Sequence, residues 1–173
     1  MYMKTNKYLL KISVFLLCVL CFAVSAEAQR KKTTTKKTTT TATTNTAEIK
    51  DGAAKVSTQV KNVSKFVYLL GTIAQGIEDI DKDTKASQAA KDKNTKNKQA
   101  VLQTIRNLRA GLAALEVEFN TKPSLKNYNI NIQGISDLCG QAESLAASGQ
   151  FLESGKPLLL IIEKLSDALV AMP

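Results

Sequence analysis

The stretch VSTQVKNVSKFVYLLGTIAQGI, Val56 to Ile77, decides the fold because its apolar residues recur at helical spacing. The steps between them alternate between four and three residues, which places them on one face of an α-helix. The residues of this seam are Val56, Val60, Val63, Val67, Leu70, Ala74 and Ile77. A long helix with one apolar face needs a partner with a matching face.

A second seam with the same spacing follows further along the chain. Its residues are Val101, Ile105, Leu108, Leu112, Leu115 and Phe119. Pro123 disfavours helical geometry at Lys122, so this helix is expected to end there, and Ser124 is suited to cap the next one. The matching seams predict that the first two helices pack against each other.

The segment Tyr128–Gln133 fits two different structures. Tyr128, Ile130 and Ile132 alternate with polar residues, which is the period of a strand. A helical spacing is also present, in Tyr128, Ile132, Ile135, Cys139 and Ala142. An isolated strand would leave its backbone groups unpaired, so we predict a helix with an irregular start near residues 127–131. Gly149 suits the left-handed position that follows such a helix.

Ser154 and Pro157 indicate the start of a fourth helix, because proline is tolerated in a first helical turn. The unbroken apolar run 158–162 predicts burial from several directions, so we expect this helix to be the central element. The solvent-exposed side of this helix is expected to carry Glu163, Lys164 and Asp167. Together the patterns predict an all-α fold, an up-down bundle of about four helices in a single domain over residues 47–173.

The first 28 residues have the three parts of a secretory signal peptide. Lys4, Lys7 and Lys11 precede an apolar run over residues 12–24, and the small-residue pattern Ala26-Glu27-Ala28 follows. The run is shorter than the roughly 20 residues that a membrane-spanning helix needs, which favours a removable signal over a permanent anchor. We therefore predict cleavage after Ala28, no membrane span in the mature chain, and a periplasmic or extracellular location.

A basic, threonine-rich segment follows the predicted cleavage site. Residues 29–46 contain no large apolar side chain, so they cannot bury enough surface to offset the entropy of ordering. This predicts a disordered tether. Its cations are Arg30, Lys31, Lys32, Lys36 and Lys37, and the segment holds no acidic residue. Residues 47–173 carry 16 basic and 14 acidic residues, so most of the +7 charge of the predicted mature chain lies in the tether.

Two uses of this tether are open from the sequence. One use is that of a polar spacer only, which is common for low-complexity segments. Alternatively, its five cations bind an anionic surface, either lipid headgroups or an acidic envelope polymer, in a strongly salt-dependent manner. We do not expect nucleic acid as a partner, because the tether has no aromatic residue for base stacking and the signal directs the chain out of the cytoplasm.

The composition argues against an enzyme. The chain has no histidine, which excludes histidine-dependent triads and the usual zinc sites. Asp79, Asp81 and Asp83 alternate like the first ligands of a calcium loop, but Thr84 and Ala90 occupy the positions that need glycine and a closing carboxylate. Pairing of Glu78 with Lys82 and of Asp81 with Lys85 on a solvated helix end explains these charges better. We expect no catalytic, metal or cofactor site.

A further hypothesis concerns the helices themselves. Phe66, Tyr68 and Leu69 lie in an apolar run that is wider than one seam, so part of that surface meets another helix or stays exposed. An exposed groove near Phe66–Leu70 would receive a small ligand or a partner helix. The one cysteine of the predicted mature chain, Cys139, is expected to be a buried apolar residue, with an intermolecular disulfide as the alternative.

The sequence resembles no family that would assign a more specific role. The prediction is an exported, non-enzymatic helical bundle that acts at the cell envelope, or as a secreted protein, in binding or structure. Its partners would be an anionic surface, through the tether, or another protein. The alternative is a bundle that binds a ligand or partner helix in the groove near Phe66–Leu70.

Overall fold

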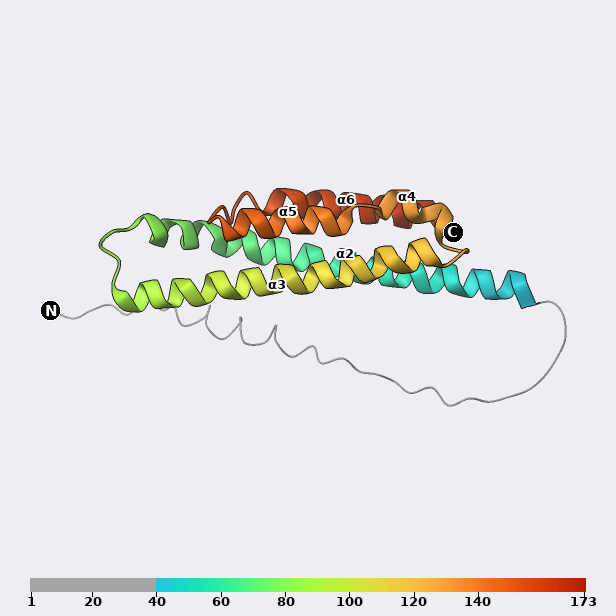
Figure 1. Ribbon diagram of the computed structural model, residues 1–173, viewed down its shortest axis with the longest axis horizontal. Helices are drawn as coiled ribbons and strands as arrows, with labels where there is room; N and C mark the ends of the chain where they lie inside the picture. Colours follow the sequence, from blue (N-terminus) through green and yellow to red (C-terminus); the bar gives the residue numbers. More distant parts are fainter. Residues whose placement is uncertain (1–39) are drawn as a thin grey trace, which may run out of the picture. The chain divides into compact units, whose positions relative to one another are not determined.

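The computed structural model describes residues 40–173, all of which belong to one compact unit, and their side chains from Asn45 onward. The predicted signal peptide, most of the predicted tether and its five cations lie outside the described residues. Within residues 40–173 the regular structure is entirely helical (Figure 1). The all-α prediction is therefore confirmed for this part of the chain.

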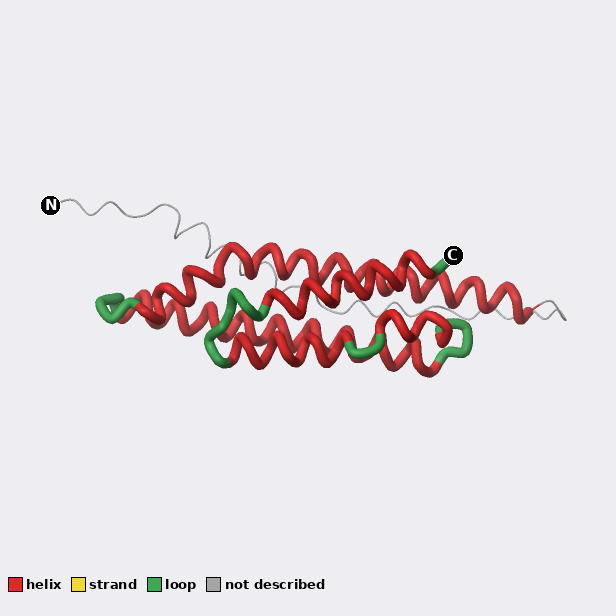
Figure 2. The backbone as a smooth tube through the Cα atoms, turned by 90° about the horizontal axis from the view of Figure 1, so that it is seen from above, coloured by secondary structure: helices red, strands yellow, loops and turns green. Residues whose placement is uncertain are grey.

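Four long helices form the bundle: α2 (Thr40–Lys82), α3 (Gln88–Thr121), α5 (Ile135–Ala147) and α6 (Gly155–Ala171). Figure 1 shows that successive long helices run in opposite directions, an up-down order. Helix α2 packs on α3 and α6, and α5 also packs on α3 and α6, so the neighbours form a closed ring. Loops lie at both ends of the α2–α3 pair, the loop between α5 and α6 is set in from one of these ends, and a short break separates α4 from α5 (Figure 2).

The two predicted seams form much of the core. Every residue of the first seam is buried or half-buried, and Val56, Val63 and Ala74 are fully enclosed. The second seam is likewise buried along α3, with Leu108 only partly covered. Since both seams face the interior, the spacing predicted the packing of α2 on α3 correctly.

Helix α2 begins at Thr40, seven residues before the start predicted for the folded domain. Residues 40–46 were predicted as part of the disordered tether, and in the structure they are helical. The threonine-rich composition misled the prediction, because β-branched residues have low helix propensity. Seven residues of low propensity can continue a helix once packed residues downstream have formed it.

Helix α3 starts and ends at local sequence signals. The Ser87 side chain accepts a hydrogen bond from the Ala90 N–H, which caps the first turn. At the other end Lys122 has an extended conformation immediately before Pro123, as predicted. Ser124 does not cap the following helix, because its hydroxyl donates to the Glu48 carboxylate.

The ambiguous segment Tyr128–Gln133 is helical, but it is interrupted. A 3₁₀ turn, η2 (Lys126–Tyr128), leads into the short helix α4 (Asn129–Ile132). Gln133 is then extended and Gly134 has φ of 86°, so the chain turns before α5 begins. This irregular start extends slightly further than predicted. Gly149, with φ of 87°, ends α5 as expected, and Gln150 N–H donates to Leu145 C=O across the turn.

Helix α6 is not the central element that its leucine-rich run predicted. Its buried side carries Leu158, Ile161 and Leu165, whereas Leu159 and Leu160 on the other side are exposed. The reason is geometric, because in a ring of four helices each helix keeps one side toward solvent. Ser154 precedes α6, but its hydroxyl donates back to the Phe151 carbonyl and makes no cap hydrogen bond.

Candidate functional site

The three residues predicted to form an apolar binding face point in different directions. Phe66 is 7% exposed and packs in the core, Tyr68 is 74% exposed, and Leu69 is half-buried. Consecutive residues of a helix lie about 100° apart, so an apolar run need not form one surface. The predicted groove near Phe66–Leu70 is therefore not assembled by these side chains.

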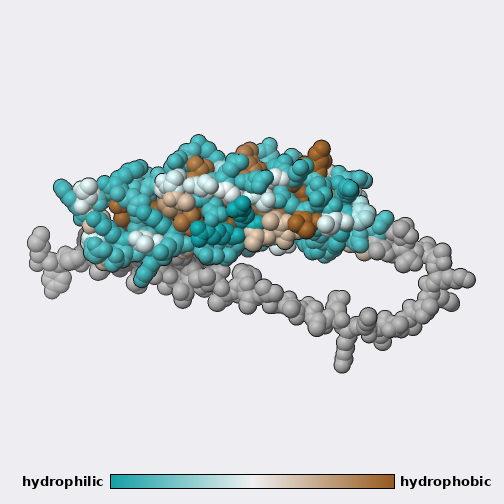
Figure 3. Space-filling view, in the orientation of Figure 1, coloured by the Kyte–Doolittle hydropathy of each residue, from teal (hydrophilic) through white to brown (hydrophobic). Residues whose placement is uncertain are grey.

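Exposed apolar side chains elsewhere on the described surface are dispersed. On the face seen in Figure 3, hydrophobic residues appear as separate patches among hydrophilic ones. The two best-defined surface depressions have volumes of about 310 and 660 Å³. Glu78, Asp81 and Gly149 line the first, and Arg109, Asp137 and Gly140 line the second, so neither includes Phe66, Tyr68 or Leu69.

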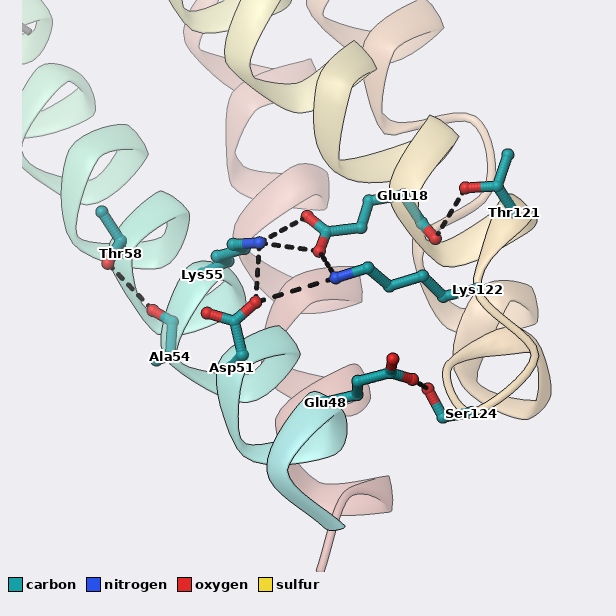
Figure 4. A network of polar contacts seen from close by, with 9 residues as sticks. All are labelled: Glu48, Asp51, Ala54, Lys55, Thr58, Glu118, Thr121, Lys122 and Ser124. Carbon is teal, nitrogen blue, oxygen red and sulfur yellow. Dashed lines mark hydrogen bonds and ion pairs between the residues drawn. The ribbon is translucent and has the colours of Figure 1, made fainter. Parts of the chain in front are cut away.

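A network of charged groups joins α2 to α3 near the start of the bundle (Figure 4). Lys55 Nζ lies 2.6 Å from Glu118 Oε1 and 2.8 Å from Asp51 Oδ2. Lys122 Nζ also contacts Glu118, at 2.5 Å, so one carboxylate is shared by two ammonium groups. These positions are 63 residues apart in sequence, which is why helical spacing alone could not predict the Lys55–Glu118 contact.

The charges of this network perturb one another. Partial burial opposes ionisation of Glu118, but hydrogen bonds from Lys122 and Lys55 and their positive charges hold its pKa below the ordinary value. Burial likewise opposes the charged form of Lys55, and the hydrogen bonds to Asp51 and Glu118 outweigh it, so the pKa of Lys55 is raised. Both pKa shifts show that the charged forms of Glu118 and Lys55 are favoured, as expected for an ion pair that joins two helices.

Polar contacts also join α3 to α5. Arg106 Nε donates to Glu143 Oε1 at 2.7 Å, and Arg109 Nη1 lies 3.4 Å from Glu143 Oε2. The hydrogen bond from Arg106, aided by both positive charges, lowers the pKa of Glu143. The Arg109 guanidinium lies against Gly140, where an added Cβ would be 3.3 Å from Cζ. Glu116 binds the Ser136 hydroxyl on the same side of α3.

Two of the three aspartates that resemble a calcium loop, Asp81 and Asp83, have separate side-chain partners. Asp81 accepts from Asn94 and pairs with Lys98 Nζ at 2.6 Å, while Asp83 accepts from its neighbour Lys85 N–H. The predicted pairing of Asp81 with Lys85 is thus wrong, and Glu78 with Lys82 is at the 4.0 Å limit. Within residues 40–173 no group of three or more potential acidic or cysteine ligands is placed to hold a metal.

Cys139 lies in the core with no exposed surface, which confirms its predicted burial. Its Sγ is 3.4 Å from the Ile105 carbonyl oxygen. Burial raises the pKa of the thiol to about 12, and the charge of Arg109 only partly offsets this. The thiol is therefore protonated at neutral pH, and the thiolate form that acts as a nucleophile is scarce.

No protein-family model, no curated protein and no solved structure matches this chain. Among the described residues, no helix combines the length and apolar character needed to cross a membrane. Of the site residues predicted from the sequence, the five cations lie outside the described residues, and Tyr68 is exposed on α2.

Proposed function

We propose that the chain is exported and acts as a non-enzymatic binding or structural module of the cell envelope, with its basic segment attached to anionic surfaces. The observation that carries this proposal is the charge of residues 30–37. Five of these eight residues are cationic and none is acidic, and the segment ends three residues before Thr40, the first residue of α2. The N-terminal signal pattern supports a periplasmic or extracellular location.

Attraction of the basic segment to an anionic surface would be substantial at low salt. Each lysine or arginine near an anionic membrane contributes about 1 kcal/mol, and salt screens this attraction within about 10 Å at 0.1 M. Several cations of the bundle are already engaged by acids of neighbouring elements: Lys55, Lys98, Lys122, Arg106 and Arg109. The basic segment adds five cations within eight residues and no acid, so the positive charge of the chain is densest there.

A charge-matched pair of variants tests the proposal in the chain that starts at Gln29. The first variant replaces all five cations of residues 30–37 by glutamine. The control replaces Lys85, Lys91, Lys96, Lys126 and Lys164 by glutamine, so both lose the same charge. We expect wild type and control to bind phosphatidylglycerol-containing vesicles or polygalacturonate at low salt, and the first variant to lose most of this binding. Equal binding by all three proteins would make the segment a spacer.

Export is tested separately, by intact-mass measurement on fractions of a secretion-competent bacterial host. We expect a product that begins at Gln29 in the periplasm or medium. A full-length product confined to the cytoplasm would contradict the export part of the proposal while leaving surface binding open to the vesicle assay.

A further inference from the structure

We propose that the outward face of α2, marked by Lys50, Lys61, Lys65 and Tyr68, lies along the same anionic membrane that the basic segment contacts. The inference rests on the proposed function of that segment and makes it more specific in two ways. It names a lipid bilayer as the surface, and it gives the bundle a defined orientation on it, with α2 toward the lipid and α5, which lies opposite α2 in the ring, turned away.

The first observation is the position of these residues on the helix. Lys50, Lys61, Lys65 and Tyr68 are all exposed, and the steps of 11, 4 and 3 residues between them keep them on one side of α2. Lys61 and Lys65 have no ion-pair or hydrogen-bond partner among the described side chains, in contrast to Lys55 on the α3-facing side. Their charges are therefore available to an external partner.

The second observation is the absence of opposing charge along this stretch. No acidic residue occurs in the sequence between Asp51 and Glu78, a span that covers more than half of α2. An anionic surface placed along it would meet Lys61 and Lys65 without a carboxylate of the same helix between them, whereas Lys50 lies next to Asp51. The stripe begins 13 residues after the last cation of the basic segment, so the two can act on one surface.

The third observation is the charge difference between the two halves of the bundle. Residues 40–128, which contain α2 and α3, carry 14 basic and 9 acidic residues, a net charge of +5. Residues 129–173, which contain α5 and α6, carry 2 basic and 5 acidic residues, a net charge of −3. A negative surface attracts the first half and repels the second, so α2 or α3 faces it, and the exposed lysines of α2 select α2.

Tyr68 distinguishes a bilayer from a soluble anionic polymer. Its ring is 74% exposed and lies one turn from Lys65 and two turns from Lys61. A ring with a polar hydroxyl suits the boundary between headgroups and acyl chains, where its apolar part is covered and its hydroxyl stays hydrated. Gly71, one turn away, has nothing within 4 Å of the space where a side chain would begin, so the ring is not covered from that side.

The experiment compares two triple variants in the chain from Gln29. Lys50, Lys61 and Lys65 are replaced by glutamine in the face variant, and Lys85, Lys91 and Lys164 in its charge-matched control. With the basic segment intact in both, we expect the face variant to bind phosphatidylglycerol vesicles roughly 10- to 100-fold more weakly than wild type at low salt. We expect the control to stay within about threefold, because its lysines lie away from the stripe.

A fluorescent reporter gives a second, independent measurement. The chain contains no tryptophan, so Tyr68→Trp introduces a single probe at the proposed contact. We expect its emission to shift to the blue, and to be quenched by brominated lipid, when anionic vesicles are added. Val170→Trp, at an exposed position of α6, is the control and is expected to change little.

The outcomes separate this inference from the proposal on which it rests. If vesicle binding needs the basic segment, but the face variant binds normally and Tyr68→Trp does not shift, the orientation is wrong and the tether proposal stands. If the chain binds polygalacturonate and not vesicles, a bilayer is the wrong surface. If the face variant loses binding while loss of the basic segment has no effect, the tether proposal fails and the α2 face remains.

Discussion

The α2–α3 half of the bundle and the α5–α6 half consist of similar helices but are held in place by different chemistry. Helix α3 is linked to both neighbours by charged groups, through Glu118 to Lys55 on α2 and through Arg106 to Glu143 on α5. Helix α6 meets its neighbours mainly through apolar residues such as Leu158 and Leu165, and the ion pair recorded for it, Lys156 with Glu153, is local.

Helices α3 and α6 are therefore positioned by different kinds of contact, polar for α3 and apolar for α6. Ion pairs and hydrogen bonds are directional, so they define how α3 is aligned with its neighbours, but their net contribution to stability at a surface is small. Apolar burial is not directional, and it supplies most of the free energy that keeps α6 in place. We therefore expect substitutions in α6 to change the free energy of unfolding most strongly. Substitutions in the charged contacts of α3 should mainly change how this free energy depends on pH.

The largest effect is expected for Leu165→Ala in α6. Leu165 has no exposed surface, so its truncation removes buried methyl groups and leaves a cavity, at a cost of about 2–5 kcal/mol in the free energy of unfolding. Urea denaturation measures this difference. The matched control is Leu160→Ala on the same helix, where the side chain is 49% exposed and we expect a loss of less than about 1 kcal/mol. Equal losses would mean that the outward side of α6 is covered.

A smaller effect is expected where the two halves meet. At Gly52 on α2, an added Cβ would lie 2.8 Å from Leu125 Cδ2 and 3.4 Å from Met172 Cε, beyond the end of α6. Gly52→Val should destabilise the bundle by about 1–3 kcal/mol through overpacking. Gly71→Val is the control, because that position is open to solvent, and its thermal midpoint should remain close to wild type. A Gly52→Val protein as stable as wild type would show that the flexible ends of Leu125 and Met172 move aside without loss.

The smallest effect, and one that depends on pH, is expected for the charged contacts of α3. Glu118 has a lowered pKa in the folded protein, so its contribution to stability is present above the unfolded pKa of about 4.3 and is lost as pH falls through the folded value. Because Lys55 and Lys122 are partly exposed, we expect Glu118→Gln to cost at most about 1 kcal/mol at pH 7.

This difference between wild type and Glu118→Gln should disappear near pH 2, as measured by urea denaturation across the acid range. Glu163→Gln on the outer side of α6 is the control and should show little difference from wild type at any pH. A Glu118 effect that persists unchanged in acid would mean that its carbon chain, and not its charge, joins α2 to α3.

The sequence predicted the α2–α3 half more accurately than the α5–α6 half. The seams from Val56 to Ile77 and from Val101 to Phe119 follow helical spacing so regularly that their burial could be inferred, and Pro123 and Gly149 act locally. The exposed leucines of α6 could not be inferred, because an apolar run contains no information about which side faces solvent. The turn at Gly134, where φ is 86°, was not predicted either.

The candidate site was predicted less completely. The basic segment is evident from composition, whereas the α2 face depends on knowing that Lys55 is engaged by Glu118 and that Lys61 and Lys65 are not. Such pairings join residues far apart in sequence. Tyr68 was noted in advance as part of an apolar run with Phe66 and Leu69, and the structure separates it from both.

Asn94 is almost completely buried, and its amide nitrogen donates to the Ile77 carbonyl and to Asp81, while its Oδ1 has no partner. A heptad seam repeats every seven residues, so apolar spacing alone does not select one alignment of two such helices. The observed alignment gives both N–H donors of the Asn94 amide an acceptor on α2. We expect Asn94→Leu to be at least as stable as wild type but to show duplicate amide signals by NMR. We infer that Asn94 selects one alignment of α2 on α3 at a cost in stability.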